Sequence, residues 1–422
     1  MSDDSVRVTK LDNGFTIASD AMTSVETASI GVWSAVGTRH EPPELNGVSH
    51  MLEHMAFKGT ERRSAKDIAV EMESVGASIN AYTTRERTAY YAKLLADDLP
   101  LGLDVLADIL QHSAFDPGEL ERERTVILQE IGQAEDTPDD IVFDHFQAAA
   151  YPDQPMGRPV LGTEETVKRL KRGDLQGYLR GSYGPERLVL AAAGRVDHDF
   201  LVERAKALFT DLPQGRPAAT VPARYVGGDH RADRDLEQVH LVLGFEGVGY
   251  LHEDYYLQSV LSTLYGGGMS SRLFQEVREN RGLVYSIYSF ASSYDDGGLF
   301  AVYAGTGEGE AGEVLPLIAE ELRRLPEGLT EEEIRRAKAQ IRADLLMARE
   351  STSARAEHLA QQLQAYGRPL TTAELLQRIE AVDRASLARF ARQLAASPPT
   401  LAALGPVGKL PSAKRVAEAF AA

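Results

Sequence analysis

The segment His50-Met51-Leu52-Glu53-His54 has the most informative spacing of chemically active side chains in the sequence. Two histidines at positions i and i+4 lie about one helical turn apart, so both imidazoles can reach a single zinc ion. Glu53 lies beside them and can act as a general base toward a water that the metal activates, without being a ligand itself. The alternative is an ordinary amphipathic helix with an exposed His/Glu face.

A catalytic zinc site has three protein ligands and an open position, so a third donor is needed. The chain has no cysteine, so any metal must be bound by His, Asp or Glu. Asp116-Pro117-Gly118-Glu119 is typical of a helix start, and apolar periodicity then continues to about Ala134. Glu123 and Glu130 would share one face of that helix, because seven residues make about two turns.

The elements that must position these side chains can be predicted from local patterns. Asn46 is a plausible N-cap and Gly59 a plausible C-cap of a short helix whose apolar stripe is Val48, Met51, Leu52 and Met55. Alternation and β-branched residues predict strands in several other segments. They are Val6–Ala18 around an Asn-Gly turn, Thr27–Val36, Ala77–Leu94, Leu188–Ala193, Val239–Phe245 and Leu283–Tyr303.

Helical patterns follow in the second half, at about Ala311–Leu325 and Glu331–Ala365. The segment Leu212–Asp235 is rich in proline and glycine and poor in apolar residues, which is typical of a linker. We therefore expect an N-terminal catalytic domain over residues 1–215, a linker over 216–234 and a C-terminal domain over 235–422. Both halves have a similar order of elements, which suggests a duplication.

Composition limits the classes of function. The chain has 422 residues, of which 43% are hydrophobic, enough for two or three domains. Its formal net charge of −18 opposes binding to nucleic acids and to anionic membranes. The start of the chain, Met1-Ser2-Asp3-Asp4, is acidic and unlike a signal peptide, and no apolar run is long enough to cross a bilayer. We expect a soluble, cytoplasmic protein.

Together these segments resemble the inverted zinc metallopeptidases, the family of pitrilysin, insulin-degrading enzyme and the mitochondrial processing peptidase β-subunit. The residues from His50 to Thr60 are similar to the signature helix of the family, and Ala77–Thr83 to its active-site edge strand. Gly157-Arg158-Pro159 and Leu161-Gly162-Thr163 resemble the processing-peptidase branch. The resemblance implies one zinc ion bound by three ligands, a general base, a supporting carboxylate and two strand residues that bind substrate. The three zinc ligands would be His50, His54 and Glu130. Glu53 would be the general base and Glu123 the supporting carboxylate, and Asn80 and Ala81 would bind substrate.

Two further residue pairs gain a role from the same resemblance. Arg278 and Tyr285 match an arginine/tyrosine pair that donates hydrogen bonds to the substrate carbonyl. The alternative is a helix end capped by Gly282, followed by a strand with a packed tyrosine. Asp140 and Asp144 resemble acidic positions that hold an arginine near the cleavage site, for which a carboxylate pair is well suited. They could also be merely solvated acids.

The resemblance implies an α+β fold in which each of two similar domains is an antiparallel sheet covered by helices. Family members enclose substrate in a chamber of four such domains, so this chain would form half of a clam-shell. We expect a homodimer, and a heterodimer with a related chain remains open. The predicted function is zinc-dependent hydrolysis of extended or unfolded peptides, with a preference for basic residues near the cleavage site. The alternative is a non-catalytic assembly or scaffold subunit like those of respiratory complexes.

Overall fold

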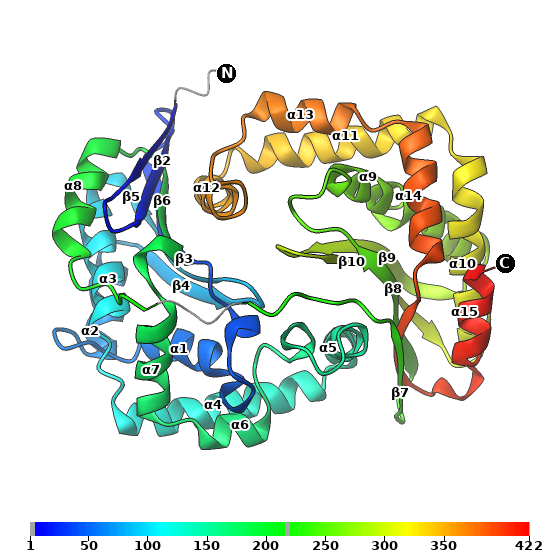
Figure 1. Ribbon diagram of the computed structural model, residues 1–422, viewed down its shortest axis with the longest axis horizontal. Helices are drawn as coiled ribbons and strands as arrows, with labels where there is room; N and C mark the ends of the chain where they lie inside the picture. Colours follow the sequence, from blue (N-terminus) through cyan, green and yellow to red (C-terminus); the bar gives the residue numbers. More distant parts are fainter. Residues whose placement is uncertain (1–4, 216–219, 422) are drawn as a thin grey trace. The chain divides into compact units, whose positions relative to one another are not determined.

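The computed structural model describes residues 5–215 and 220–421 and has an α+β fold (Figure 1). The chain forms two compact units, each built from three stretches of sequence. Unit 1 contains Met1–Gly132, Arg158–Val221 and Leu346–Thr371. Unit 2 contains Gln133–Gly157, Pro222–Leu345 and Thr372–Ala422. The predicted class of two α+β domains is confirmed.

Unit 1 contains a six-stranded sheet in the order β1-β2-β6-β3-β5-β4. All neighbouring strands are antiparallel except β2 and β6, which are parallel, so the sheet is mixed and not wholly antiparallel as expected. β4 lies at the edge of this sheet. The strands are β1 (Val6–Lys10), β2 (Thr16–Ala21), β3 (Thr27–Ser34), β4 (Ser78–Thr83), β5 (Thr88–Leu95) and β6 (Leu188–Gly194).

Helices cover both faces of this sheet. The main core lies on one face, where alternate strand residues such as Ile17, Ile30 and Leu190 pack against the helices. On the other face lies α12 (Thr352–Tyr366) (Figure 1). It packs against small side chains that include Ala18, Ala191 and Ala193. The remaining helices of the unit are α1 (Val48–Ala56), α2 (Ala65–Ser74), α3 (Leu99–Gln111), most of α4 (Pro117–Glu135), α6 (Glu164–Arg169), α7 (Arg172–Ser182) and α8 (His198–Leu208).

Unit 2 repeats this plan with a five-stranded sheet in the order β7-β11-β8-β10-β9. Here β7 and β11 are the parallel pair. The strands are β7 (Gly228–Asp233), β8 (Gln238–Gly247), β9 (Val284–Ser293), β10 (Gly298–Gly307) and β11 (Thr400–Gly405). One face packs against helices that include α9 (Tyr255–Gly266), α10 (Ala311–Gly328) and α14 (Arg384–Ala396), and the other against α5 (Pro138–Ala150). The unit also contains α11 (Glu331–Ala348), α13 (Thr372–Glu380) and α15 (Ala413–Ala421).

The compact units differ from the two halves of the sequence in one exchange of helices. α5, from the first half, packs on the sheet of unit 2, and α12, from the second half, packs on the sheet of unit 1. The predicted linker, 216–234, also differs: residues 216–219 lie outside the described part of the chain, and Gly228–Asp233 forms β7. The helical stretch predicted from Glu331 to Ala365 is interrupted, since α11 ends at Ala348 and α12 begins at Thr352.

The helices of residues 5–215 and 220–421 include none with the length and apolar character that crossing a membrane requires.

Candidate metal centre

The helix α1 carries the two histidines, and its apolar stripe is buried as predicted: Val48, Met51, Leu52 and Met55 are at most 2% exposed. The predicted caps are wrong. The N-cap is Gly47, in a left-handed conformation with φ of 95°, and not Asn46, whose side chain donates to Glu41 Oε2. The helix ends at Ala56, before Gly59.

Glu41 supplies the acceptors that the start of α1 needs. Its buried carboxylate accepts from Gly47 N at 2.9 Å and from Ser49 N at 2.8 Å. Two N–H groups that have no partner within the helix are thereby satisfied, and the negative charge lies at the positive end of the helix dipole. Because Ser49 directly precedes His50, Glu41 fixes the turn that carries the first histidine.

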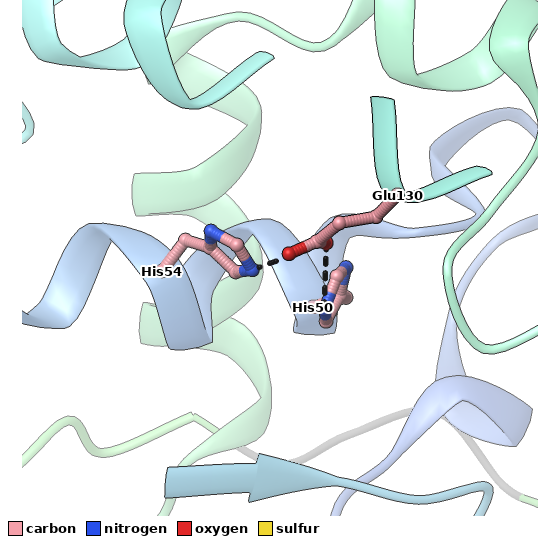
Figure 2. A group of neighbouring side chains, drawn as sticks. All are labelled: His50, His54 and Glu130. Atoms are coloured by element: carbon pink, nitrogen blue, oxygen red, sulfur yellow. Dashed lines mark ion pairs between the residues drawn. The ribbon is translucent and has the colours of Figure 1, made fainter. Parts of the chain in front are cut away.

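His50, His54 and Glu130 form one compact group of potential ligands (Figure 2). The Nε2 atoms of His50 and His54 lie 3.7 Å and 3.5 Å from Glu130 Oε2. Ligands at about 2.0 to 2.1 Å from a tetrahedral zinc ion would be separated by about 3.3 Å, so this spacing fits the ion closely. Glu130 Oε2 is also buried without a hydrogen-bond partner, as expected of an oxygen that binds a cation. The described residues contain no second group of this kind.

Electrostatics favour the form of His50 that binds a metal. Burial, together with the neighbouring His54, lowers the pKa of His50 to about 4. The imidazole is therefore neutral at pH 7, and neutral imidazole is the ligand form.

Glu123 fixes the orientation of the second histidine. This buried side chain of α4 has Oε2 at 2.8 Å from His54 Nδ1, and a carboxylate can only accept, so Nδ1 carries the proton. The other ring nitrogen, Nε2, is then available to bind a metal, and it faces Glu130 (Figure 2). Glu123 and Glu130 share a face of α4 as the spacing predicted, and Ile127 lies buried between them.

Glu53 lies on α1 between the two histidines in sequence; its side chain is half-buried and its Oε2 atom is buried. Burial raises its pKa above the usual range, and a hydrogen bond from the Thr83 side chain partly opposes that effect. Its Oε2 atom has no hydrogen-bond partner. A carboxylate with a raised pKa and a free oxygen has the properties of a general base.

The edge strand β4 ends beside this group. α1 packs against β4, and Thr83, the last residue of β4, also contacts Ser49 O through its hydroxyl at 3.5 Å. Asn80 is exposed and Ala81 is buried. The Asn80 side chain accepts from Ala81 N at 2.8 Å, so this N–H is not used in the pairing with β5. β4 therefore presents backbone groups outward, next to Glu53.

The other predicted site residues belong to unit 2, whereas the metal group belongs to unit 1. The guanidinium of Arg278 lies 5.6 Å from the ring centroid of Tyr285, so the structure brings this pair together, and Tyr285 is 77% exposed. Arg278 is in a π-helical segment, Phe274–Asn280, after which Gly282 has a φ of 65°. Asp140 and Asp144 lie on α5, the first exposed and the second half-buried.

Sequence reasoning missed three residues that shape this centre. Glu41 caps α1 from outside the helix, and no local spacing indicates it. Thr83 contacts Glu53 from another element. Lys58 lies in the loop after α1 and pairs with Glu123 of α4, so local spacing does not indicate it either.

Comparisons with known proteins agree with this geometry. Residues 16–164 match the family described as insulinase (peptidase family M16), and residues 169–341 match the peptidase M16 inactive domain. A zinc protease of Rickettsia bellii is 40% identical over 94% of this chain and 97% of its own length. The mitochondrial-processing peptidase subunit beta of Mus musculus is 38% identical over 97% of this chain and 86% of its own. A protease structure from Helicobacter pylori has a TM-score of 0.89 at 22% identity, covering 95% of this chain and 99% of the other.

Proposed function

We propose that this chain, a zinc metallopeptidase that belongs to the insulinase family of peptidases (family M16), is an endopeptidase for peptides bound in an extended conformation. One observation carries the proposal: two of the candidate metal ligands, His50 and His54, and the carboxylate of Glu53 lie on α1, which packs against the edge strand β4. A site of this kind offers a peptide chain both a place to bind and the means of its hydrolysis.

The residues of unit 1 divide the chemistry between them. His50, His54 and Glu130 would hold zinc, and Glu123 orients His54. A zinc ion in such a site lowers the pKa of a bound water to about 7 and polarises a carbonyl group. Glu53 takes a proton from the attacking water and delivers it to the nitrogen of the leaving amine. Its raised pKa supports both steps, because the carboxyl group can hold the proton between them.

Substrate binding is proposed to occur by strand addition to β4. An extended peptide can pair with the outward backbone groups around Asn80 and Ala81, since edge strands have unpaired N–H and C=O groups. The Asn80 side chain must then release Ala81 N. Folded proteins rarely offer a free strand, so the preferred substrates would be unfolded.

Two groups of unit 2 complete the proposal. Arg278 and Tyr285 would donate hydrogen bonds to the developing oxyanion, and the exposure of Tyr285 supports this role. Asp140 and Asp144 would hold a substrate arginine near the cleavage site, because two carboxylates on one helix face suit a guanidinium fork.

The assembly follows from the same parts. The chain has both the ligand group and the arginine/tyrosine pair, so a homodimer in the cytoplasm could supply every component. A relative named as a subunit of a processing peptidase keeps a heterodimer open. The complete ligand group argues against a purely structural subunit, since such a role needs no metal site.

The experiment compares one protein substrate in two states. The purified chain is incubated with a disulfide-bonded domain in its native form and in its reduced, unfolded form. We expect cleavage of the unfolded form only, its loss on zinc chelation and its recovery when zinc is restored. Equal rates on both forms would contradict strand addition, and cleavage that survives chelation would contradict the metal mechanism.

A further inference from the structure

Lys58 forms an ion pair with the carboxylate that orients the second histidine. Its Nζ atom lies 2.6 Å from Glu123 Oε1, while Glu123 Oε2 binds His54 Nδ1. The Glu123 side chain is 7% exposed and that of Lys58 31% exposed. A buried carboxylate is costly without a counter-charge, and Lys58 supplies one. The three side chains therefore form a continuous series from the loop to the metal ligand.

The loop that carries Lys58 is attached to the segment leading into α4. Ala114 N donates to Gly59 O at 3.0 Å, and Glu61 N donates to His112 O at 3.2 Å. Thr60 and Ser113 form an isolated antiparallel bridge. Since α4 begins at Pro117, these main-chain bonds hold Lys58 near Glu123 independently of their charges.

A buried ionic network fixes the far end of the same loop. Arg63 Nη1 donates to Asp108 Oδ2 at 2.7 Å, and Thr60 Oγ1 donates to the same oxygen at 2.8 Å. Asp108 is fully buried and Arg63 is 9% exposed. A loop held at this many points has its main chain fixed at Lys58, so only the lysine side chain must be ordered to form the ion pair with Glu123.

We propose that Lys58 is a positioning residue of the metal centre: it holds the Glu123 carboxylate in the orientation that keeps the proton on His54 Nδ1 and leaves Nε2 for zinc. The inference rests on the proposed ligands His50, His54 and Glu130. Only Oε1 of Glu123 is available to the cation, because Oε2 serves His54. The ammonium point charge of lysine suits a single acceptor better than the planar fork of arginine.

The test uses Lys58→Met, which keeps the length of the side chain and removes its charge, and Lys58→Arg, which restores the charge. Lys168→Met is the control, because Lys168 is exposed and pairs with Glu164 within α6. Zinc affinity is measured by competition with a chelator. We expect Lys58→Met to bind zinc about tenfold more weakly, which is the lower end of the effect of removing a residue that contacts a metal ligand directly. Lys58→Arg should recover part of the zinc affinity, and the control should bind zinc as the wild type does.

A second measurement separates positioning from stability. Nitrogen NMR of the His54 ring in the metal-free protein should show the proton on Nδ1 in the wild type and a mixture of tautomers in Lys58→Met. Zinc affinity within twofold of wild type and an unchanged tautomer would overturn the proposal. If Lys58→Met does not fold, Lys58→Gln is judged by the same two criteria. If the wild type bound no zinc, the ligand assignment would be wrong, but the tautomer measurement would still decide the role of Lys58.

Discussion

The carboxylate of Glu41 accepts a hydrogen bond from Ser49 N, the backbone amide that directly precedes His50, the first histidine of the candidate metal centre. The same carboxylate binds Gly47 N and the Asn46 side chain, so all three donors depend on one buried charge. The position of α1 is therefore set by Glu41, a residue outside this helix. Burial raises the pKa of Glu41, and these three hydrogen bonds oppose that effect.

Glu41→Gln should destabilise the metal-free protein by about 1 to 3 kcal/mol. Both carboxylate oxygens of Glu41 accept from N–H groups, so in either orientation of the glutamine amide its NH₂ group faces another donor. A buried donor without an acceptor costs about 1 to 3 kcal/mol. Urea unfolding measures the change, with Glu44→Gln as the control because Glu44 is exposed. An equal stability of both variants would show that the helix does not need the Glu41 charge.

His50→Ala and Glu130→Gln should each lose zinc and peptidase activity while the fold survives. Two donors bind a metal far more weakly than three, and neither side chain belongs to the hydrophobic core cluster of unit 1. Metal analysis of the purified variants measures zinc per chain, and circular dichroism checks the fold. His358→Ala, at an exposed position of α12, should keep its zinc. Full zinc occupancy in the first two variants would show that the ligands are other residues.

Glu53→Gln should retain zinc and substrate binding but lower turnover by roughly 10²-fold or more, the contribution of a positioned general base. The amide has nearly the same shape and cannot accept the proton from water. Zinc content, peptide affinity and kcat are measured on the same preparation, and Glu73→Gln, at an exposed position of α2, is the control. Near-normal turnover would mean that another group activates the water.

The contribution of His50 to the stability of the metal-free protein should be lost between about pH 6.5 and pH 4. The pKa of His50 is lowered from 6.5 to about 4 in the folded chain, so the unfolded chain takes up a proton first as the pH falls. The contribution is present above pH 6.5 and is lost as the pH falls to about 4, and it reaches at most about 3 kcal/mol. His40 has the same shift and adds to the effect.

Urea unfolding from pH 7 to pH 4.5 tests this pH dependence. His50→Gln removes one titrating group, so its stability should depend less steeply on pH than that of the wild type or of His358→Gln. The comparison uses slopes, because burying an amide changes stability equally at every pH. Equal slopes for all three proteins would show that His50 titrates normally in the folded chain.

The parts of this structure that follow from local pattern were predictable from the sequence. The apolar stripe of α1 and the shared face of Glu123 and Glu130 require only helical periodicity, and both are present. Family resemblance indicated Glu130, which lies far from the histidines in sequence. Ser351 caps α12 by accepting from Ala354 N, a signal that could have shown the break before this helix.

The remaining features depend on contacts between distant segments. β7 has the polar sequence Gly-Asp-His-Arg-Ala-Asp and is a strand only because it pairs with β11 at the edge of a sheet. The exchange of α5 and α12 is set by which sheet face each helix covers, and neither helix carries a sequence signal for its partner. Glu41 lies before a 3₁₀ helix, Pro43–Leu45, and its side chain binds the start of α1, a contact that no periodicity describes.

Replacing a substrate arginine with lysine should weaken cleavage if Asp140 and Asp144 hold the guanidinium. An exposed ion pair is worth only about 0 to 1 kcal/mol, so a strong preference requires that both carboxylates bind the planar fork together. Lysine offers a point charge and no fork, and it would lose part of that binding. The double variant Asp140→Asn with Asp144→Asn should erase the preference, while zinc content and hydrolysis of neutral peptides remain. Asp136→Asn with Asp153→Asn removes the same charge from other positions of unit 2 and is the matched control. If the Asp140/Asp144 variant preferred arginine as strongly as its control, the two aspartates would be a solvated helix face, and the selectivity would have to come from elsewhere in the substrate path.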